Sequence, residues 1–385
     1  MINTNQYALL ELLKASLFSY SPAFPYNTDW DAVLKEAKDQ GVASLVFNAV
    51  PQEEVTKWEG HKKRSAAYFI WVLQAQNELL KLFESNEIPL VILKGNAAAL
   101  YYPNPSLRAV GDIDFLVPQS RFEESKALMD NSGYKRLHGN IDDARHIEYS
   151  KNDVFFEMHH HFSSMGLDIE PAVISGLNRV EYASLFGMKF PILPVLENGL
   201  VLLTHIRQHL LDEVFSLGLK QIIDWMMYVH ANVGKDGWDD DFFDLASTYG
   251  LETLAITVTH LCQKWLGLPV VPEWVKYADE KTSNELLETV MSSGNFGVKL
   301  EKVKNPIKTT FLNVKKDGVF RYLQEAGMEN WKAAQKYVIL RPFAWCYQIV
   351  RYIKKSLLRV LSGKSITKEF SETTSKADFF RRLGI

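Results

Sequence analysis

The sequence predicts an α/β protein in which a small mixed sheet lies between mainly helical N- and C-terminal regions. Two observations carry this prediction. Apolar residues stand three or four positions apart up to about residue 87, then form short continuous or alternating runs, and return to helical spacing from about residue 190. The chain has 385 residues and is 47% hydrophobic, so it can bury a large core. We therefore expect a helical region at 1–87, an α/β core at 88–189 and a helical region at 190–385.

The predicted helices have apolar residues on one face. Before the core, the runs are ALLELLKASLF, DWDAVLKEAKDQGVASLVFNAV and SAAYFIWVLQAQNELLKLFESN. After it, they are VLENGLVLLTHIRQHLLDEVF, LKQIIDWMMYVHANV and DDFFDLASTYGLETLAITVTHLCQKWL. Spacing of this kind is typical of helices that pack one face on a core.

The core alternates strands and helices. The apolar run IPLVILKG (88–95) ends in glycine, and the short helical run NAAALYY follows it. Next come the strand IDFLVP and the helix SRFEESKALMDNSGY. The runs ARHIEYS and DVFFEMHHHF then predict a hairpin, with KND as its tight turn.

Composition excludes several classes of protein. The net charge of −3 gives no strong signal for nucleic-acid binding. Cys262 and Cys346 lie far apart, which fits a reducing compartment and argues against a disulfide framework or a cysteine zinc site. The first residues have no secretory signal pattern, and no apolar run reaches the roughly 18 residues of a transmembrane segment. We expect a cytoplasmic protein.

The stretch RAVGDIDFLVP places two carboxylates in an otherwise apolar strand. Side chains alternate along a strand, so Asp112 and Asp114 share one face, and a cation should lie between them. Carboxylates at positions i and i+2 can bind Mg²⁺ or Mn²⁺, and two such ions serve phosphoryl transfer. A third carboxylate is expected from the hairpin. Glu157 lies on the face of His159 and is preferred to Glu148 on the neighbouring strand.

Three stretches resemble the polymerase-β-like nucleotidyltransferases, and more specifically a bacterial family of uncharacterised nucleotidyltransferases. They are LVILKGNAAALYYPNPSLRAVGDIDFLVP, FFEMHHHF and LLTHIRQHLLDEVFSLGLKQIIDW, and together they span about residues 85–230. The resemblance implies that Gly95 binds the triphosphate of an NTP through its backbone N–H, beside Asn96, where Ser or Gly is usual. It also implies that Asp112 and Asp114 hold the metals and that Glu157 is the third carboxylate.

The activity implied is Mg²⁺-dependent or Mn²⁺-dependent transfer of a nucleoside monophosphate from an NTP, with release of pyrophosphate. The acceptor is unidentified and could be a small molecule, a sugar or a protein. The alternative is a non-catalytic nucleotide-binding or scaffold protein that retains the fold. The three carboxylates argue against this alternative, whereas Asn96 leaves it open.

Two cations flank the predicted site. Lys94 and Arg108 could neutralise the triphosphate. Alternatively, Lys94 is a solvated charge at the end of a strand, and Arg108 pairs with one of the two aspartates. His159 is expected to orient phosphate or a carboxylate. Zinc at His159 and His161 is disfavoured, because no cysteine is nearby to complete a tetrahedral set.

The C-terminal half carries three further features. His205 and His209 stand one helical turn apart and could bind a metal, although histidines packed over the site or in the core are preferred. Lys220 and Asp224 have the spacing of a helix-surface ion pair. The region 336–368 has eight Lys or Arg and no Asp or Glu, so it could contact an anionic surface weakly or simply expose a basic face. The resemblance makes the helices after the core a lid or a platform for the acceptor.

Overall fold

The computed structural model describes most of the chain in two units. The described residues are 2–137, 146–164, 167–211, 217–299, 323–324, 327–328, 331, 333–334, 337–351 and 376–385. One unit comprises 1–300 with 383–385, and the other comprises 301–382. All the residues of the predicted catalytic site belong to the first unit.

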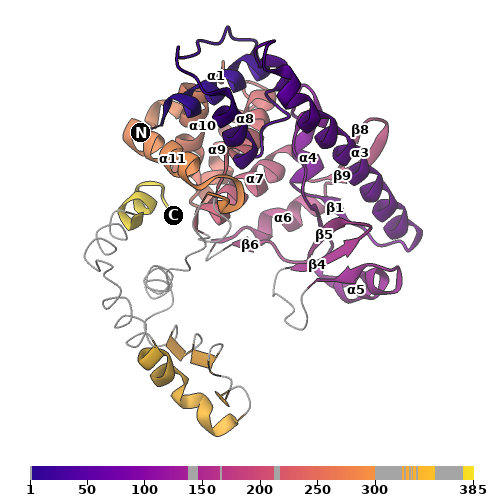
Figure 1. The fold of residues 1–385 in the computed structure, drawn as a ribbon. Coiled ribbons are helices and arrows are strands. Elements are labelled where there is room, and N and C mark those ends of the chain that lie inside the picture. Colours follow the sequence, from indigo (N-terminus) through magenta and orange to yellow (C-terminus); the bar gives the residue numbers. More distant parts are fainter. Residues whose placement is uncertain are drawn as a thin grey trace. The chain divides into compact units, whose positions relative to one another are not determined.

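Three helices precede the sheet: α1 (Thr4–Phe18), α2 (Trp30–Asp39) and α3 (Val55–Ser85). Asn3 begins α1 with a capping box, in which its side chain accepts from the Gln6 N–H while the Gln6 side chain accepts from the Asn3 N–H. Figure 1 shows α3 as the long indigo helix beside β8, β9 and β1. The helical pattern of the N-terminal region is therefore confirmed.

Seven strands form one mixed sheet in the order β3-β4-β5-β2-β1-β9-β8. Their bounds are β1 (Val91–Ile92), β2 (Ile113–Leu116), β3 (Lys135–Arg136), β4 (His146–Lys151), β5 (Val154–His159), β8 (Glu181–Leu185) and β9 (Met188–Ile192). The central strand β2 is parallel to β5 and antiparallel to β1. The predicted α/β fold with a small mixed sheet is confirmed.

The two faces of β2 differ as period-two alternation requires. Ile113 and Phe115 lie in the main hydrophobic core, where Phe115 contacts Phe83 of α3 edge to face at 5.6 Å between ring centroids. Phe156 and Met158 of β5 join the same core. The carboxylates therefore lie on the opposite face of the sheet.

Shorter elements connect the strands: α4 (Gly95–Ala99), α5 (Phe122–Asn131), α6 (Glu170–Leu177) and a two-stranded ladder of β6 (Ser163–Ser164) and β7 (Leu167–Asp168). Short 3-10 helices lie at Phe47–Ala49, Pro105–Leu107, Gln119–Arg121, Glu273–Tyr277, Asn295–Gly297 and Val338–Phe343. The predicted tight turn is confirmed, since Asn152 and Asp153 have φ of 50° and 57° between the paired residues Lys151 and Val154.

The hairpin of β8 and β9 was not predicted. It extends the sheet at β1, where Ile192 pairs with Ile92, so the sheet ends at Ile192 rather than at residue 189. The side chains of β8 are mostly exposed, and an edge strand of this kind lacks the apolar alternation on which the prediction relied.

In the part of the first unit between the sheet and residue 299, the structure describes five helices: α7 (Val195–Leu211), α8 (Leu219–Asn232), α9 (Trp238–Thr248), α10 (Glu252–Leu266) and α11 (Glu280–Ser293). In Figure 1 they gather with α1 on one side of the strands. Two predicted helical runs are broken, one after α2 at Gly41 and one between α9 and α10 at Gly250, where φ is 70° and 65°. Glycine adopts this left-handed conformation readily, which ends each helix.

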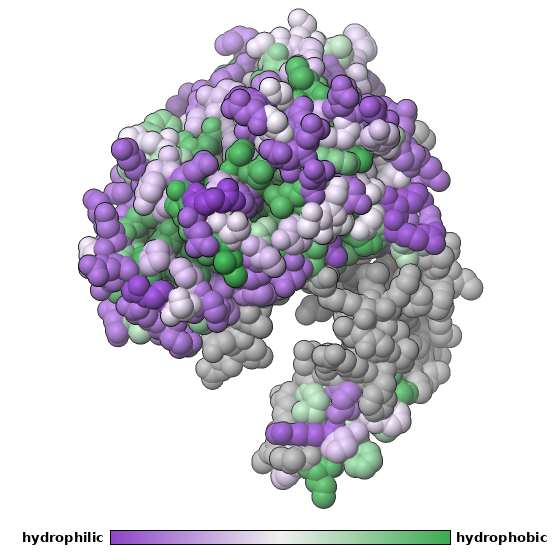
Figure 2. All heavy atoms as spheres, turned by 180° about the vertical axis from the view of Figure 1, so that it is seen from behind, coloured by the Kyte–Doolittle hydropathy of each residue, from purple (hydrophilic) through white to green (hydrophobic). Residues whose placement is uncertain are grey.

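On the face shown in Figure 2, small hydrophobic patches lie among hydrophilic residues. Among the described residues, no helix has the length and apolarity needed to span a membrane. Of the basic region at 336–368, the structure describes 337–351, in which 344–351 are helical, and the rest lies outside the described residues.

Candidate active site

Three carboxylates converge on the polar face of the sheet. Asp114 of β2 and Glu157 of β5 are directly paired across the parallel ladder, and Asp112 precedes β2. One oxygen from each of the three lies within 4.8 Å of the others. The prediction that Glu157 faces the same side as both aspartates is confirmed. Glu148 remains 52% exposed and lies outside this group.

Lys94 places an ammonium group against Asp114 and Glu157. Its Nζ lies 2.6 Å from Asp114 Oδ1 and 3.8 Å from Glu157 Oε2. Burial disfavours the ammonium, but Asp114, Glu157 and Asp112 outweigh this effect and raise the pKa of Lys94. Lys94 is therefore buried and paired, and the interpretation of it as a solvated charge at the end of a strand is wrong.

An unusual backbone turn places Lys94 at this position. Lys94 has φ 42° and ψ −135°, a region that residues with a Cβ rarely adopt, and Gly95 follows with φ 31°. A Cβ built on Gly95 would lie 3.6 Å from the Asp112 carbonyl oxygen, so the start of α4 lies against the segment that carries the aspartates. The side-chain amide of Asn96 donates a hydrogen bond to the side-chain oxygen of Gln76 on α3, at 2.9 Å.

Two histidines complete the cluster. His159 Nε2 lies 3.1 Å from Asp114 Oδ1 and 3.5 Å from Glu157 Oε2, and His146 Nε2 of β4 lies 3.0 Å from Glu157 Oε1. His159 thus contacts two of the carboxylates, as one of the two roles expected of it requires. His161 lies elsewhere, with its Nδ1 3.3 Å from a carboxylate oxygen of Glu170.

The surroundings of Asp114 and Glu157 shift the pKa values of the two carboxyl groups in opposite directions. Burial raises the pKa of Asp114 to about 7, with Asp112 and Glu157 adding to the effect and Lys94 opposing it. Burial also disfavours ionised Glu157, but His159 and Lys94 outweigh it and hold the Glu157 pKa well below its usual range. Burial and neighbouring charges therefore raise the proton affinity of Asp114, whereas His159 and Lys94 lower that of Glu157.

Arg108 makes a different ion pair from the one considered. Its Nε and Nη2 each lie 2.7 Å from an oxygen of Asp224 on α8, and the Tyr102 hydroxyl donates to the same carboxylate at 2.7 Å. The proposed pairing of Arg108 with Asp112 or Asp114 is therefore wrong. This buried bidentate pair joins α8 to the segment that leads into β2.

Lys220 and Asp224 on α8 do not form the surface ion pair that their spacing predicts. The Asp224 side chain is 6% exposed and binds Arg108, so the two do not form a surface pair. Burial and then the charge of Arg108 lower the pKa of Lys220 to about 8, and the charges of Asp224, Asp112 and Asp114 partly oppose this. Lys220 therefore lies within electrostatic reach of the carboxylates, which the sequence analysis missed.

His205 of α7 is also close to the site. Burial and then the charge of Lys94 lower its pKa well below the usual range, and Glu157 opposes them. Its Nε2 lies 2.9 Å from His209 Nε2. This favours the interpretation of histidines packed over the site, and α7 and α8 both border the carboxylate cluster.

A family model described as uncharacterised nucleotidyltransferase matches residues 26–267, more than half of the chain. The chain belongs to this family. It is a nucleotidyltransferase, and the match includes all three carboxylates, Lys94 and both histidines of the cluster.

Solved structures resemble this nucleotidyltransferase more distantly. The crystal structure of ANT(2″)-Ia in complex with adenylyl-2″-tobramycin is 14% identical, with a TM-score of 0.33, over 46% of this chain and 97% of that one. The solution structure of the antibiotic-resistance factor ANT(2″)-Ia is 15% identical, with a TM-score of 0.34, over 47% and 93%. The lincomycin-bound lincosamide antibiotic adenylyltransferase LnuA is 13% identical, with a TM-score of 0.27, over 39% and 92%. Values this low carry no argument about the acceptor. No curated protein matches the chain.

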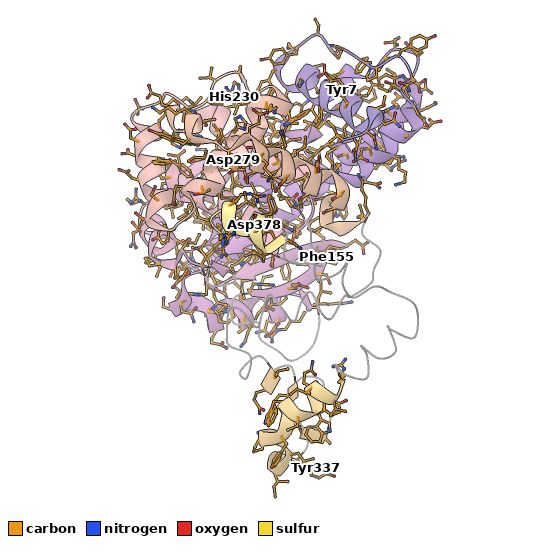
Figure 3. All side chains as sticks on the ribbon, turned by 90° about the vertical axis from the view of Figure 1, so that its left-hand side faces the viewer. Tyr7, Phe155, His230, Asp279, Tyr337 and Asp378 are labelled. Carbon is orange, nitrogen blue, oxygen red and sulfur yellow. The ribbon has the colours of Figure 1, made fainter. Side chains whose placement is uncertain are left out.

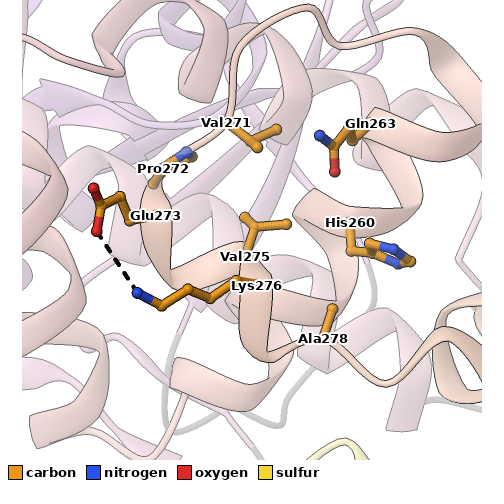
Figure 4. Close-up of a pocket in the computed structure, with 8 residues that line it drawn as sticks. All are labelled: His260, Gln263, Val271, Pro272, Glu273, Val275, Lys276 and Ala278. Atoms are coloured by element: carbon orange, nitrogen blue, oxygen red, sulfur yellow. Dashed lines mark ion pairs between the residues drawn. The ribbon is translucent and has the colours of Figure 1, made fainter.

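The nucleotidyltransferase also has a surface hollow of about 570 Å³ beside α10. Figure 4 shows its lining, including His260, Gln263 and the ion pair of Lys276 with Glu273 at 3.7 Å. None of the three clustered carboxylates lines this hollow, so we do not assign the reaction to it.

Proposed function

We propose that this enzyme transfers a nucleoside monophosphate from an NTP to an acceptor hydroxyl, phosphate or amine, with Mg²⁺ or Mn²⁺ as the cofactor. The convergence of Asp112, Asp114 and Glu157 carries the proposal. Mg²⁺ prefers oxygen ligands at about 2.0–2.1 Å, and carboxylate oxygens within 4.8 Å of one another fit such an ion after small side-chain rotations. The ammonium of Lys94 against Asp114 also supports the view that this position favours a cation.

The divalent cation, when bound, supplies electrostatic stabilisation of the attacking and leaving oxygens. Asp112 and Asp114 would hold it, and the acceptor atom would attack the α-phosphorus in line with the departing pyrophosphate. A new bond forms between the acceptor and this phosphorus, and the bond from the same phosphorus to the bridging oxygen of the pyrophosphate breaks. The acceptor proton leaves to a nearby base or to solvent.

Glu157 suits the role of a metal ligand better than that of a base. Its low pKa keeps it ionised at neutral pH, which favours cation binding and makes it a weak proton acceptor. We therefore propose that Glu157 completes the metal site.

The triphosphate is proposed to lie over the start of α4. Gly95 contributes its backbone N–H there, and Lys94 can turn from Asp114 to a phosphate oxygen once the carboxylates hold a cation. Lys220 of α8 is a further candidate for phosphate binding, because its ammonium lies within electrostatic reach of Asp112 and Asp114. Asn96, Arg108 and His159 are proposed to support the phosphate site, and the bonds of their side chains to Gln76, Asp224 and Asp114 favour a positioning role.

The acceptor is proposed to be a small molecule, a sugar or a protein side chain that enters beside α7 and α8. We further propose that the enzyme works in the cytoplasm, on the evidence of its cysteine content.

The decisive experiment incubates the protein with each α-labelled NTP, Mg²⁺ or Mn²⁺, and a panel of acceptors, followed by mass analysis. We expect labelled product and pyrophosphate from the wild type and neither from Asp112→Asn. Because the acceptor is unknown, calorimetry of NTP binding with Mg²⁺ provides a second readout. NTP binding that is equally tight in the wild type and in Asp112→Asn would contradict the proposed metal site.

Glu157→Gln tests the third carboxylate separately. We expect its transfer rate to fall by at least about 100-fold, because a neutral amide is a poorer ligand for the divalent cation than a carboxylate. NTP binding should fall much less, since Asp112, Asp114 and Gly95 are intact. A near-normal transfer rate would remove Glu157 from the site.

A further inference from the structure

A second donor set lies beside the carboxylate cluster. It consists of His146 of β4 and of Glu157 and His159 of β5, and one donor atom from each lies within 4.8 Å of the others. His146 and His159 are directly paired across the antiparallel ladder, so the backbone itself brings the two imidazoles to the same face. Their ring centroids are 5.3 Å apart.

The imidazole nitrogens already face the carboxylate. His146 Nε2 lies 3.0 Å from Glu157 Oε1, and His159 Nε2 lies 3.5 Å from Glu157 Oε2. Two donors at about 2.1 Å from one ion are roughly 3.0–3.4 Å apart when they subtend an angle between 90° and 109°. The observed separations of 3.0 and 3.5 Å, each to a different oxygen of Glu157, are close to this range. One donor atom from each of the three residues also lies within 4.8 Å of the others, so the three side chains can converge on one ion when the rings rotate.

The chemistry of these donors differs from that of the aspartate site. Two imidazoles and one carboxylate suit first-row transition ions such as Mn²⁺, Co²⁺ and Zn²⁺, and they leave coordination positions open. Mg²⁺ prefers oxygen ligands and is poorly served by two nitrogens.

We propose that His146, Glu157 and His159 form a binding site for a divalent transition-metal ion, next to the proposed Mg²⁺ site. The two sites share Glu157, whose Oε1 faces His146 and whose Oε2 faces Lys94 and His159. Binding needs neither NTP nor acceptor, so the proposal goes beyond the proposed function and does not require turnover.

Co²⁺ is the probe of choice, because its visible absorption reports nitrogen ligation and its affinity can be measured by calorimetry. We expect the untagged, metal-free full chain to bind one equivalent of Co²⁺ without NTP. His146→Ala removes a donor that lies outside the three-carboxylate group and should weaken binding at least tenfold. Asp112→Asn should change Co²⁺ affinity less than about threefold, although it abolishes nucleotidyl transfer.

His230→Ala is the matched control. His230 lies on α8 against Phe18, and Figure 3 labels it among the helices, apart from Phe155 on β5. Its loss should leave both the Co²⁺ affinity and the Co²⁺ spectrum unchanged. His146→Gln and thermal unfolding by circular dichroism check that the loss of affinity in His146→Ala does not come from unfolding.

Crystals soaked in Zn²⁺ give a direct readout, and an anomalous peak should lie between His146 and His159. The proposal is overturned if the wild type binds no Co²⁺, if His146→Ala binds it normally, or if Asp112→Asn abolishes its binding while His146→Ala does not. These outcomes are separate from a failure of the proposed function, in which Co²⁺ would bind at the histidines but no NTP would react.

Discussion

Replacing Asp114 by Asn should abolish nucleotidyl transfer and at the same time stabilise the metal-free protein. The Asp114 side chain is 5% exposed and lies in a group of three carboxylates with one ammonium at 2.6 Å. Asn is nearly isosteric with a protonated carboxyl group, so it keeps the packing while it removes both a proposed metal ligand and a buried negative charge.

The size of the stabilisation follows from the pKa of Asp114. The raised value of about 7, against 3.8 in the unfolded chain, means that ionising this group costs the folded state about 4 kcal/mol above pH 7. The value already includes the attraction by Lys94, so about 4 kcal/mol is the upper limit of the gain. Because an amide cannot accept from both Lys94 and His159 as well as a carboxylate does, we expect a net gain of roughly 1–4 kcal/mol at pH 8.

The pH dependence has a defined sign. Between about pH 4 and pH 7 folded Asp114 retains a proton that the unfolded chain has lost, so the contribution of Asp114 to wild-type stability falls as the pH rises through this window. Asp114→Asn lacks this loss. The free energy of unfolding of this variant should therefore equal that of the wild type at pH 4. The difference in favour of the variant should grow towards pH 7 and stay constant above it.

Urea unfolding in EDTA at several pH values measures this difference, and labelled-NTP turnover measures the activity. Asp112→Asn is the matched control: Asp112 is exposed, so its replacement should abolish transfer but change stability by less than about 0.5 kcal/mol. A loss of stability in Asp114→Asn at pH 8, or a gain that does not depend on pH, would refute the reasoning. Turnover close to that of the wild type would refute the assignment of Asp114 as a metal ligand.

Three further predictions concern the helices that border the site. Asp224→Asn should destabilise the protein by about 3–5 kcal/mol in urea unfolding, because it leaves the buried Arg108 guanidinium without its carboxylate; an effect below about 1 kcal/mol would contradict this. Lys220→Met should raise the melting temperature at pH 7, because the folded protein disfavours the charged lysine at this position. The difference in melting temperature from the wild type should disappear as the pH rises from about 8 to 10.5, where the wild-type lysine is neutral in the folded protein. A difference that is unchanged at pH 10.5 would contradict this. Gly199→Ala should lower the melting temperature, since a Cβ on Gly199 would lie 2.1 Å from the Tyr228 hydroxyl oxygen where α7 packs on α8; an unchanged melting temperature would show that the helices can move apart.

Local pattern was sufficient for the strand that carries the aspartates. Period-two alternation put Asp112 and Asp114 on one face and Ile113 and Phe115 on the other, and the structure confirms both faces. It was not sufficient for β8, because an exposed edge strand has little apolar alternation to detect.

The hairpin contained more information than was extracted from it. A two-residue turn at Asn152 and Asp153 pairs Lys151 with Val154, and counting back along both strands then pairs His146 with His159. The proximity of His146 to Glu157 was therefore predictable once the turn was placed, since strand register follows from turn length.

The sequence by itself determined the α/β class, the shared face of the two aspartates and the choice of Glu157, because each depends on side-chain periods within one strand or on a resemblance between short motifs. Only the tertiary structure decided the partners of the charged side chains. Arg108 and Asp224 are more than a hundred residues apart in the chain, and Lys94 reaches Asp114 through a backbone turn that no periodic pattern predicts. A buried charge must find an opposite charge in space, so its partner depends on how the helices pack on the sheet rather than on spacing along the chain.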